Sequence, residues 1–386
     1  MMRHFKPYSW ILVVSGLTVF HKLQANDNHK TKTMWKFFCL AYSLVCFTIF
    51  MFVGVLFVLQ FIILFFIKVQ VFTIWLHVVS FSVINFKVVH NALCIAFNSG
   101  NLSRFFDESA RYEAAVNFVP PNCCRQPAGR YVQRFVQLIV FLGSLSISTY
   151  LACIFIDYNV SDVAVGALLK VTCLAGTFLF YVYQMSDFIV LRPCLEVLLW
   201  YIRQQHEVLL CLTKGGCSGL LFVKRDKKVE EIRLSLCAIL LLKNRLNGIW
   251  RWSVMISGSV VLLLACISIY TAYVEGFSTV QTFLGLLYCV LSLLDLLDVA
   301  GLSQEMVNEI RSMRQTLEST PARFESGPYF AEISYLRDTI KPNQMAISGA
   351  GFFYLNLPLI VSLPGSVITY TVILVQTSES MAPTTK

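Results

Sequence analysis

Polar side chains recur at regular steps in the last apolar stretch of the chain, Met345 to Thr377, which carries no charge over its 33 residues. Steps of three and four residues place the following positions on one face of a helix: Ser362, Ser366, Thr369, Ile373 and Gln376. Hydroxyl and amide groups in a membrane helix either hydrogen-bond to neighbouring helices or line a water-filled path enclosed by several helices. The spacing of these residues does not decide between helix packing and a water-filled path.

The residues on and beside this stripe resemble a known signature. Thr369 and Tyr370, followed after five residues by Gln376, read TYTVILVQ, which resembles the end of the seventh span of insect gustatory receptors. The upstream sequence GFFYLNLPLI, residues 351–360, is also similar to that span, whereas Thr377 stands where the family has Phe. The resemblance implies a seven-helix chemoreceptor channel related to insect odorant receptors, with a cytoplasmic amino terminus and an extracellular carboxyl terminus.

The composition is that of a polytopic membrane protein. Of the 386 residues, 56% are hydrophobic and only 14% are charged, and the mean hydropathy is +0.66. A soluble domain usually carries about 25% charged residues. The apolar runs predict an all-α membrane protein with seven spans. These spans are Phe37 to Ile67, Val71 to Phe97, Tyr131 to Ile156, Gly166 to Val190, Trp252 to Val274, Gln281 to Leu302 and Met345 to Thr377.

Long helices are expected to continue from the spans into the cytoplasm. The helical pattern of the fourth span runs past Pro193 to Leu212, and that of the sixth span runs on to Glu318. A glycine-rich linker at 215–220 separates the fourth-span extension from the charged helix that leads into the fifth span. We therefore divide the chain into a cytoplasmic amino-terminal segment (1–36), a bundle of six spans that binds the ligand (37–303), a cytoplasmic helical anchor (304–344), a pore-lining seventh helix (345–377) and an extracellular tail (378–386).

The distribution of basic residues predicts the orientation. Lys and Arg concentrate in residues 1–38, 98–130, 191–250 and 304–342, whereas the opposite side has only Lys68 and Lys386. Basic segments are retained in the cytoplasm, so the amino terminus is inside and the net charge of +9 requires no nucleic-acid partner. On this topology the sequon at Asn101 lies inside, and the sequon at Asn159 lies outside as a glycosylation candidate.

The sequence offers no enzyme site. It lacks recognised hydrolase and zinc motifs, and its thirteen cysteines lie in apolar spans or in segments assigned to the reducing cytosol, so we expect no disulfide, metal or cofactor. Asp295 and Asp298 share one face of the sixth span near its inner end. They would either pair with basic residues of neighbouring helices or handle a cation or proton.

The family resemblance implies a role for each stripe residue. In a homo- or heterotetramer, four copies of Ser362, Ser366 and Thr369 would face water along the pore. Near the outer end, four Ile373 side chains would form an apolar gate, and four Gln376 amides would hydrogen-bond across the closed ring. Tyr370, turned by about 100° from Thr369, would pack against the neighbouring helix. With no carboxylate in the stripe, monovalent and divalent cations would pass with little selectivity.

The resemblance also implies a pocket for a small extracellular tastant among the outer halves of spans two to six. The aromatic and histidine side chains in these halves are the candidate ligand contacts. They are Trp75, His77, Tyr150, Tyr270, Tyr273 and Tyr288.

The expected function is a taste receptor and ligand-gated cation channel in the plasma membrane of gustatory receptor neurons, in contact with membrane lipids. Sugar-sensing members of the family carry Glu after the Thr-Tyr pair, and here Thr371 favours a bitter or other non-sugar ligand. A G-protein-coupled receptor is the first alternative, disfavoured by the inverted charge asymmetry. A transporter is the second, for which the sequence shows neither inverted repeats nor matched broken spans.

Overall fold

The computed structural model describes residues 11–16, 31–67, 71–118, 128–159, 162–213, 222–276, 280–319 and 328–381. Most of the amino-terminal segment, the glycine-rich linker at 215–220, Lys68 and the end of the tail, 382–386, lie outside these ranges. Within them the chain is helical apart from one antiparallel two-stranded hairpin. The predicted all-α class is therefore confirmed.

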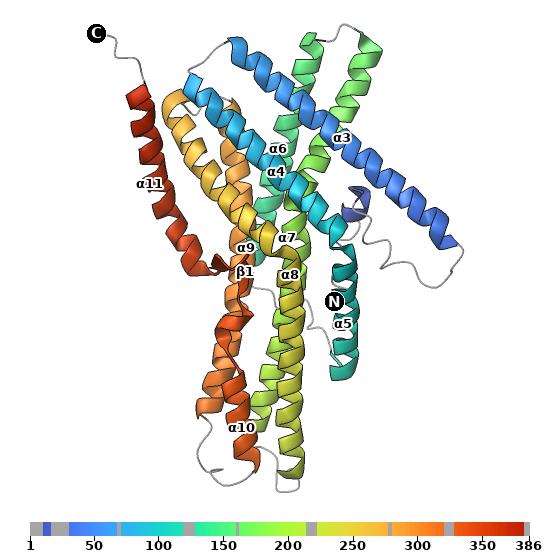
Figure 1. The fold of residues 1–386 in the computed structure, drawn as a ribbon, viewed down its shortest axis with the longest axis vertical. Helices are drawn as coiled ribbons and strands as arrows, with labels where there is room; N and C mark the ends of the chain where they lie inside the picture. Colours follow the sequence, from blue (N-terminus) through green and yellow to red (C-terminus); the bar gives the residue numbers. More distant parts are fainter. Residues whose placement is uncertain are drawn as a thin grey trace.

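Seven of the helices overlap the seven predicted spans in the predicted order (Figure 1). The α-helices described from Thr31 onward are α3 (Thr31–Ile67), α4 (Val71–Phe97), α5 (Ser99–Val116), α6 (Ala128–Asn159), α7 (Val163–Thr213), α8 (Phe222–Glu275), α9 (Val280–Ser319), α10 (Pro328–Thr339) and α11 (Leu357–Met381). Six of them contain a stretch long and apolar enough to cross a membrane; α3, the helix of the first predicted span, has its apolar stretch at Leu40–Leu56.

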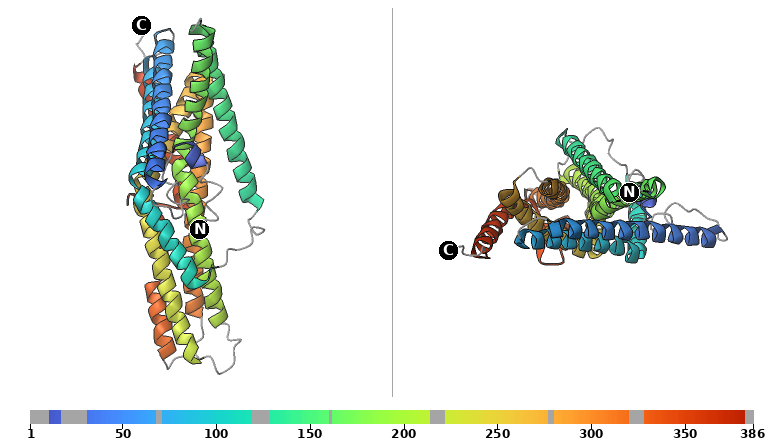
Figure 2. Two further views of the ribbon diagram at one scale, coloured as in Figure 1. Left: turned by 90° about the vertical axis from the view of Figure 1, so that its right-hand side faces the viewer. Right: turned by 90° about the horizontal axis from the view of Figure 1, so that it is seen from above.

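Three helices are much longer than a bilayer is thick. α7, α8 and α9 contain 51, 54 and 40 residues, and at about 1.5 Å per residue each exceeds the ~30 Å hydrocarbon core. Their extensions form a narrow bundle with α10 at one end of the molecule (Figures 1 and 2). The prediction that α7 continues past Pro193 is confirmed, because the helix is unbroken there.

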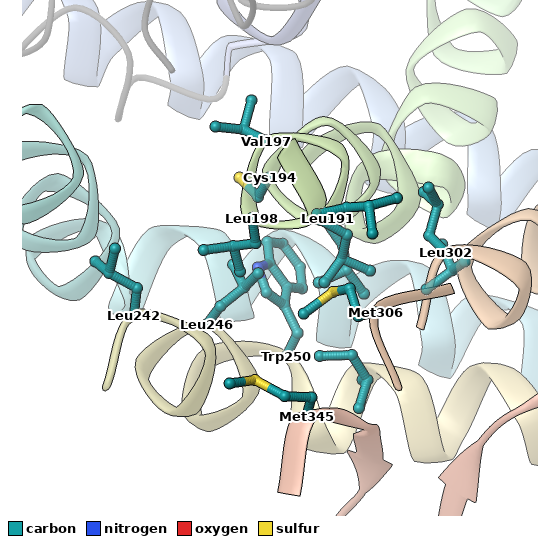
Figure 3. Close-up of a cluster of buried hydrophobic side chains, with 14 of the residues drawn as sticks. Leu191, Cys194, Val197, Leu198, Leu242, Leu246, Trp250, Leu302, Met306 and Met345 are labelled. Carbon is teal, nitrogen blue, oxygen red and sulfur yellow. The ribbon is translucent and has the colours of Figure 1, made fainter. Parts of the chain in front are cut away.

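The core of this narrow bundle is built around a tryptophan. Trp250 of α8 is fully buried, and Leu198 of α7 and Met306 of α9 are buried beside it (Figure 3). Burying such large apolar side chains contributes roughly 1.5–3 kcal/mol each. The extensions are therefore a packed domain core that fixes how the three long helices leave the membrane.

The membrane half is more loosely assembled. In α8 and in α9, half of the residues in the apolar 18-residue stretch are buried. In α6 and in α11 the buried share of that stretch is only 11%. In Figure 1, α11 stands at the edge of the molecule, and it contacts only α8 and α9 extensively. The faces of α11 that the single subunit leaves open must meet lipid, water or another subunit.

The structure corrects the prediction of one continuous helix from Met345. Residues Ile347–Gly349 (β1) and Phe353–Leu355 (β2) form a hairpin, and α11 begins only at Leu357. Ala350 and Gly351 adopt positive φ angles of 51° and 85°, which makes the turn and excludes a helix. Asn356 then caps α11, because its side-chain oxygen accepts the Leu359 N–H at 3.0 Å.

The hairpin is held to the long helices by side chains. Asn247 of α8 accepts the Ser348 N–H at 3.0 Å, and Ser303 of α9 accepts the Ile347 N–H at 3.0 Å. These bonds pair two backbone N–H groups of β1 with the long helices. The hairpin therefore fixes where α11 starts relative to α8 and α9.

Gly349 has no room for a side chain. A β-carbon built on it would lie 2.5 Å from the Phe353 ring, and overpacking of this kind costs about 1–3 kcal/mol. We expect Gly349→Ala to lower the melting temperature of the detergent-solubilised protein. Gly301→Ala in α9 is the matched control, since nothing lies within 4 Å of its β-carbon position. Equal melting temperatures for the two variants would contradict this packing.

Candidate functional site

The stripe of α11 faces away from its own subunit. Ile360 and Val367, at 8% and 9% exposure, are buried on the side that packs on α8 and α9. At about 100° per residue, the centre of the stripe lies about 150° around the helix from them. The side chains of Ser362, Thr369, Ile373 and Gln376 are accordingly exposed, and that of Ser366 is half-buried.

The hydroxyl groups of the stripe donate hydrogen bonds to their own helix. Ser362 donates to the Leu359 carbonyl at 2.7 Å, and Thr369 donates to the Gly365 carbonyl at 3.0 Å. Ser366 makes a longer bond, 3.5 Å, to the Ser362 carbonyl. Each hydroxyl oxygen thus keeps acceptor capacity on the exposed face. Tyr370, 53% exposed, lies beside the stripe and is free to contact another helix.

A second candidate site is a cavity of about 130 Å³ among α3, α4, α6 and α7. Its lining residues are Phe50, Val53, Gly54, Phe81, Asn85, Ser148, Gly176, Thr177, Phe180 and Tyr181. Gly176 lets α3 and α7 approach closely here, because a β-carbon at this position would lie 2.3 Å from Val53. Thr177 and Phe180 belong to the middle of the predicted fourth span, so the cavity lies near mid-membrane.

The cavity has an apolar wall with few polar groups. The Phe50 and Phe180 rings are stacked with centroids 6.4 Å apart, and Phe180 meets Tyr181 edge-to-face at 5.6 Å. Polar groups are supplied by Asn85 and by the hydroxyls of Ser148 and Tyr181, which lie 3.1 Å apart. A dry cavity of about 150 Å³ is known to accept benzene. The arrangement therefore suits one small ring with one or two polar substituents.

The six side chains proposed as ligand contacts do not line this cavity. Trp75, Tyr150 and Tyr273 are 60–71% exposed, and His77 is half-buried. Tyr270 is buried edge-to-face with Phe72 at 5.6 Å. Tyr288 is buried in a cluster against which Phe180 packs, so it lies behind the cavity wall without lining the cavity. None of the six lines the pockets found among the described residues, and their contact with a ligand stays a prediction. Asn159 ends α6, and its glycosylation likewise stays a prediction.

Buried charges connect the helices next to the cavity. Lys87 of α4 is 1% exposed, interacts electrostatically with Asp187 of α7, and lies 5.3 Å from the centre of the Phe188 ring. Asp187 in turn accepts a hydrogen bond from Ser257 of α8 at 2.7 Å. A charge at this depth persists only with such partners.

The acidic pair of the sixth span has structural partners. Arg192 of α7 lies 2.7 Å from an Asp298 carboxylate oxygen, and Gln137 of α6 donates to Asp295 at 3.0 Å. The expectation that a basic residue pairs with this acidic face is confirmed for Asp298. These contacts join α6, α7 and α9 at the end of the membrane half that leads into the narrow bundle.

The sequence alone did not predict the cavity or the buried Lys87–Asp187 pair beside it. Asp187 inside an apolar span is a visible signal, because an intramembrane carboxylate needs a partner. Lys87 inside the second predicted span gives the same signal. The cavity residues Ser148, Gly176 and Tyr181 carry no such signal, since only the packing of α3 against α7 makes them neighbours.

Comparisons with known proteins agree with this fold. The family model described as 7tm Chemosensory receptor matches residues 5–381. Two solved structures of the insect olfactory receptor OR5 from Machilis hrabei, one in complex with eugenol, are similar to the chain with a TM-score of 0.69 and 15% identity each. The alignment covers 98% of both chains for the eugenol complex, and 96% of this chain and 97% of the other for the second structure. No curated protein sequence matches the chain significantly.

The Arg192 guanidinium balances the negative charge of buried carboxylates, so replacing it should lower the stability of the protein. We expect Arg192→Met to destabilise the protein by about 3–5 kcal/mol, because Asp298 and Glu196 stay buried and lose the guanidinium beside them. Arg203→Met is the matched control on the same helix. Arg203 pairs with Glu305 at 3.0 Å, but both side chains are over one-third exposed, and such pairs contribute about 0–1 kcal/mol.

Thermal melting of detergent-solubilised variants measures this difference. The double variant Arg192→Met with Asp298→Leu should recover part of the loss, since it removes both charges. A melting temperature of Arg192→Met equal to that of Arg203→Met would show that the buried pair does not hold α7 to α9.

Proposed function

Because the chain belongs to the 7tm chemosensory receptor family, we propose that it is a gustatory receptor, a subunit of a ligand-gated, nonselective cation channel that a small extracellular tastant opens. The tastant is a bitter or other non-sugar compound. The receptor works in the plasma membrane of gustatory receptor neurons, along dendrite, cell body and axon.

The exposed polar stripe of α11 carries this proposal. Its hydroxyl and amide groups face away from the subunit that holds the helix. In lipid, such groups have no further partners, whereas a ring of α11 copies supplies them with water. A tetramer, of identical or related chains, places each stripe toward a common axis and leaves the buried side of α11 on α8 and α9.

The stripe then gives the pore its gate and its selectivity. Ile373, 48% exposed, forms the apolar constriction that excludes water when closed, and Gln376 adds a ring of amides one turn further out. The stripe contains no ionisable side chain, so both monovalent and divalent cations permeate.

The cavity among α3, α4, α6 and α7 supports a small, mainly apolar ligand. A sugar needs a hydrogen-bond partner for each of its many hydroxyls, whereas this wall offers chiefly the amide of Asn85 and the hydroxyls of Ser148 and Tyr181. The similar OR5 structure holds eugenol, a small aromatic compound. The cavity residues therefore replace the six surface and core aromatics as our first choice of ligand contacts.

Ligand binding must favour the open state to open the channel. α4 and α7 of the cavity both pack on α8, and α8 packs on α11. The Cys266 thiol of α8 lies 3.8 Å from the Val367 carbonyl of α11. A shift of α4 or α7 that fits the ligand better is thereby transmitted through α8 to the helix that carries the gate.

Whole-cell recording in a cell without its own chemoreceptors tests this function. We expect a panel of small aromatic and bitter compounds to evoke a cation current that persists under G-protein blockade. Ile373→Ala should raise the leak current, because a smaller side chain widens the apolar constriction. Ile368→Ala is the matched control, since Ile368 is 65% exposed but lies about 120° from the stripe.

Two results would contradict the proposal. Ligand binding with no direct conductance would favour the alternative, a G-protein-coupled receptor. Concentrative uptake of the ligand, with no current through the Ile373→Ala variant, would favour the second alternative, a transporter.

A further inference from the structure

A polar groove of about 360 Å³ lies between α8 and the segment that leads into α11. Lys243 and Asn244 of α8 form one side, and Asn343, Gln344, Ser348 and Tyr354 form the other. Lys243 lies nine residues before Trp252, where the fifth span begins, and is therefore about 13 Å below the span on the cytoplasmic side. The groove is separate from both the cavity and the pore stripe.

Lys243 is a buried cation without a counter-charge. It is 6% exposed and donates a hydrogen bond to the Gln344 carbonyl at 2.8 Å, and the part of the chain that the structure describes provides it with no carboxylate. Burial alone lowers the pKa of its ammonium to about 8. A buried charge of this kind is costly unless an anion pairs with it.

The remaining groups of the groove are suited to an anion. Asn244 and Asn343 present exposed amides, Tyr354 is 58% exposed and carries a hydroxyl, and no carboxylate lines the groove among the described residues. One ammonium with neutral N–H and O–H donors around it is a common arrangement for a phosphate group, which Lys binds as a point charge.

We propose that this groove is a cytoplasmic binding site for a phosphate group, a site beyond the proposed ligand-gated conductance. The phosphate belongs either to a soluble cytosolic molecule or to the headgroup of an inner-leaflet lipid, since the groove lies close to the membrane.

An occupied groove would act on the pore helix. Gln344 and Ser348 precede α11 in the chain and already bond to α8, Gln344 through Lys243 and Ser348 through Asn247. A phosphate held between Lys243 and this segment adds a further link between α8 and the hairpin. Such a ligand shifts the channel toward whichever state keeps the two sides of the groove close.

The purified full-length receptor tests the site through binding, independently of channel activity. In detergent it is titrated with inorganic phosphate and, separately, with inositol trisphosphate. In nanodiscs it is compared with and without phosphatidylinositol bisphosphate. Chloride at equal ionic strength is the reference. We expect a saturable rise in melting temperature in at least one arm, and Lys243→Gln should weaken that binding about tenfold or more.

The variants separate a ligand site from a purely structural lysine. Lys243→Gln keeps a donor for the Gln344 carbonyl, so its unliganded fold should persist. Asn343→Asp places a carboxylate on the exposed rim and should also weaken binding, with no buried group disturbed. Lys228→Gln, an exposed lysine of α8 fifteen residues earlier, should bind as the wild type does.

The arms also identify the source of the phosphate. Binding of inorganic phosphate or inositol trisphosphate in detergent that is as tight as binding of the phosphoinositide in nanodiscs assigns the site to a soluble ligand. Binding that is about tenfold tighter in nanodiscs, or detectable only there, assigns it to a lipid headgroup, because inositol trisphosphate carries the same headgroup without the acyl chains. No saturable binding in any arm, or equal binding by the wild type, Lys243→Gln and Asn343→Asp, would overturn the proposal.

Discussion

A polar side chain inside a membrane must be paired with protein or water, and this constraint decides the rest of the structure. The chain meets this constraint in two ways. Charges such as Lys87 and Asp187 are buried within the subunit and paired across α4, α7 and α8. The polar groups of α11 are instead left open on the side turned away from its packing partners. The first arrangement holds a subunit together, and the second requires neighbours or water that a single subunit lacks.

The long helices link these two arrangements. α7, α8 and α9 pass from the membrane half into a narrow bundle packed around Trp250, which gives the loosely assembled membrane half a fixed base. The hairpin is bonded to α8 and α9 at the level of this core, through Asn247 and Ser303, and it sets the start of α11. Movement of α11 is therefore constrained at one end by the bundle and along one side by α8.

The sequence predicted the parts of the fold that periodicity and charge control. The extension of α7 to Thr213 was visible because charged residues appear on a helix pattern that continues past the apolar run. The hairpin was missed because hydropathy does not distinguish an apolar turn from an apolar helix. The local signals were nevertheless present, in the Gly349 to Gly351 turn and in Asn356 two residues before Pro358. The cavity was beyond sequence reasoning, since it exists where Gly176 admits Val53, a contact between helices far apart in the chain.

The reactivity of cysteines along α11 toward an aqueous reagent measures most directly whether the polar stripe of this helix faces water. Cysteines are introduced singly at Ser366, Thr369 and, as a lipid-side control, Ile368, and labelling by a small charged thiol reagent is compared with that of the parent protein at rest and under stimulation. We expect labelling at Ser366 and Thr369, increased by an activating ligand, and no labelling at Ile368. Failure of both stripe cysteines to react in either state, or reaction at Ile368 alone, would contradict a water-filled path along this helix.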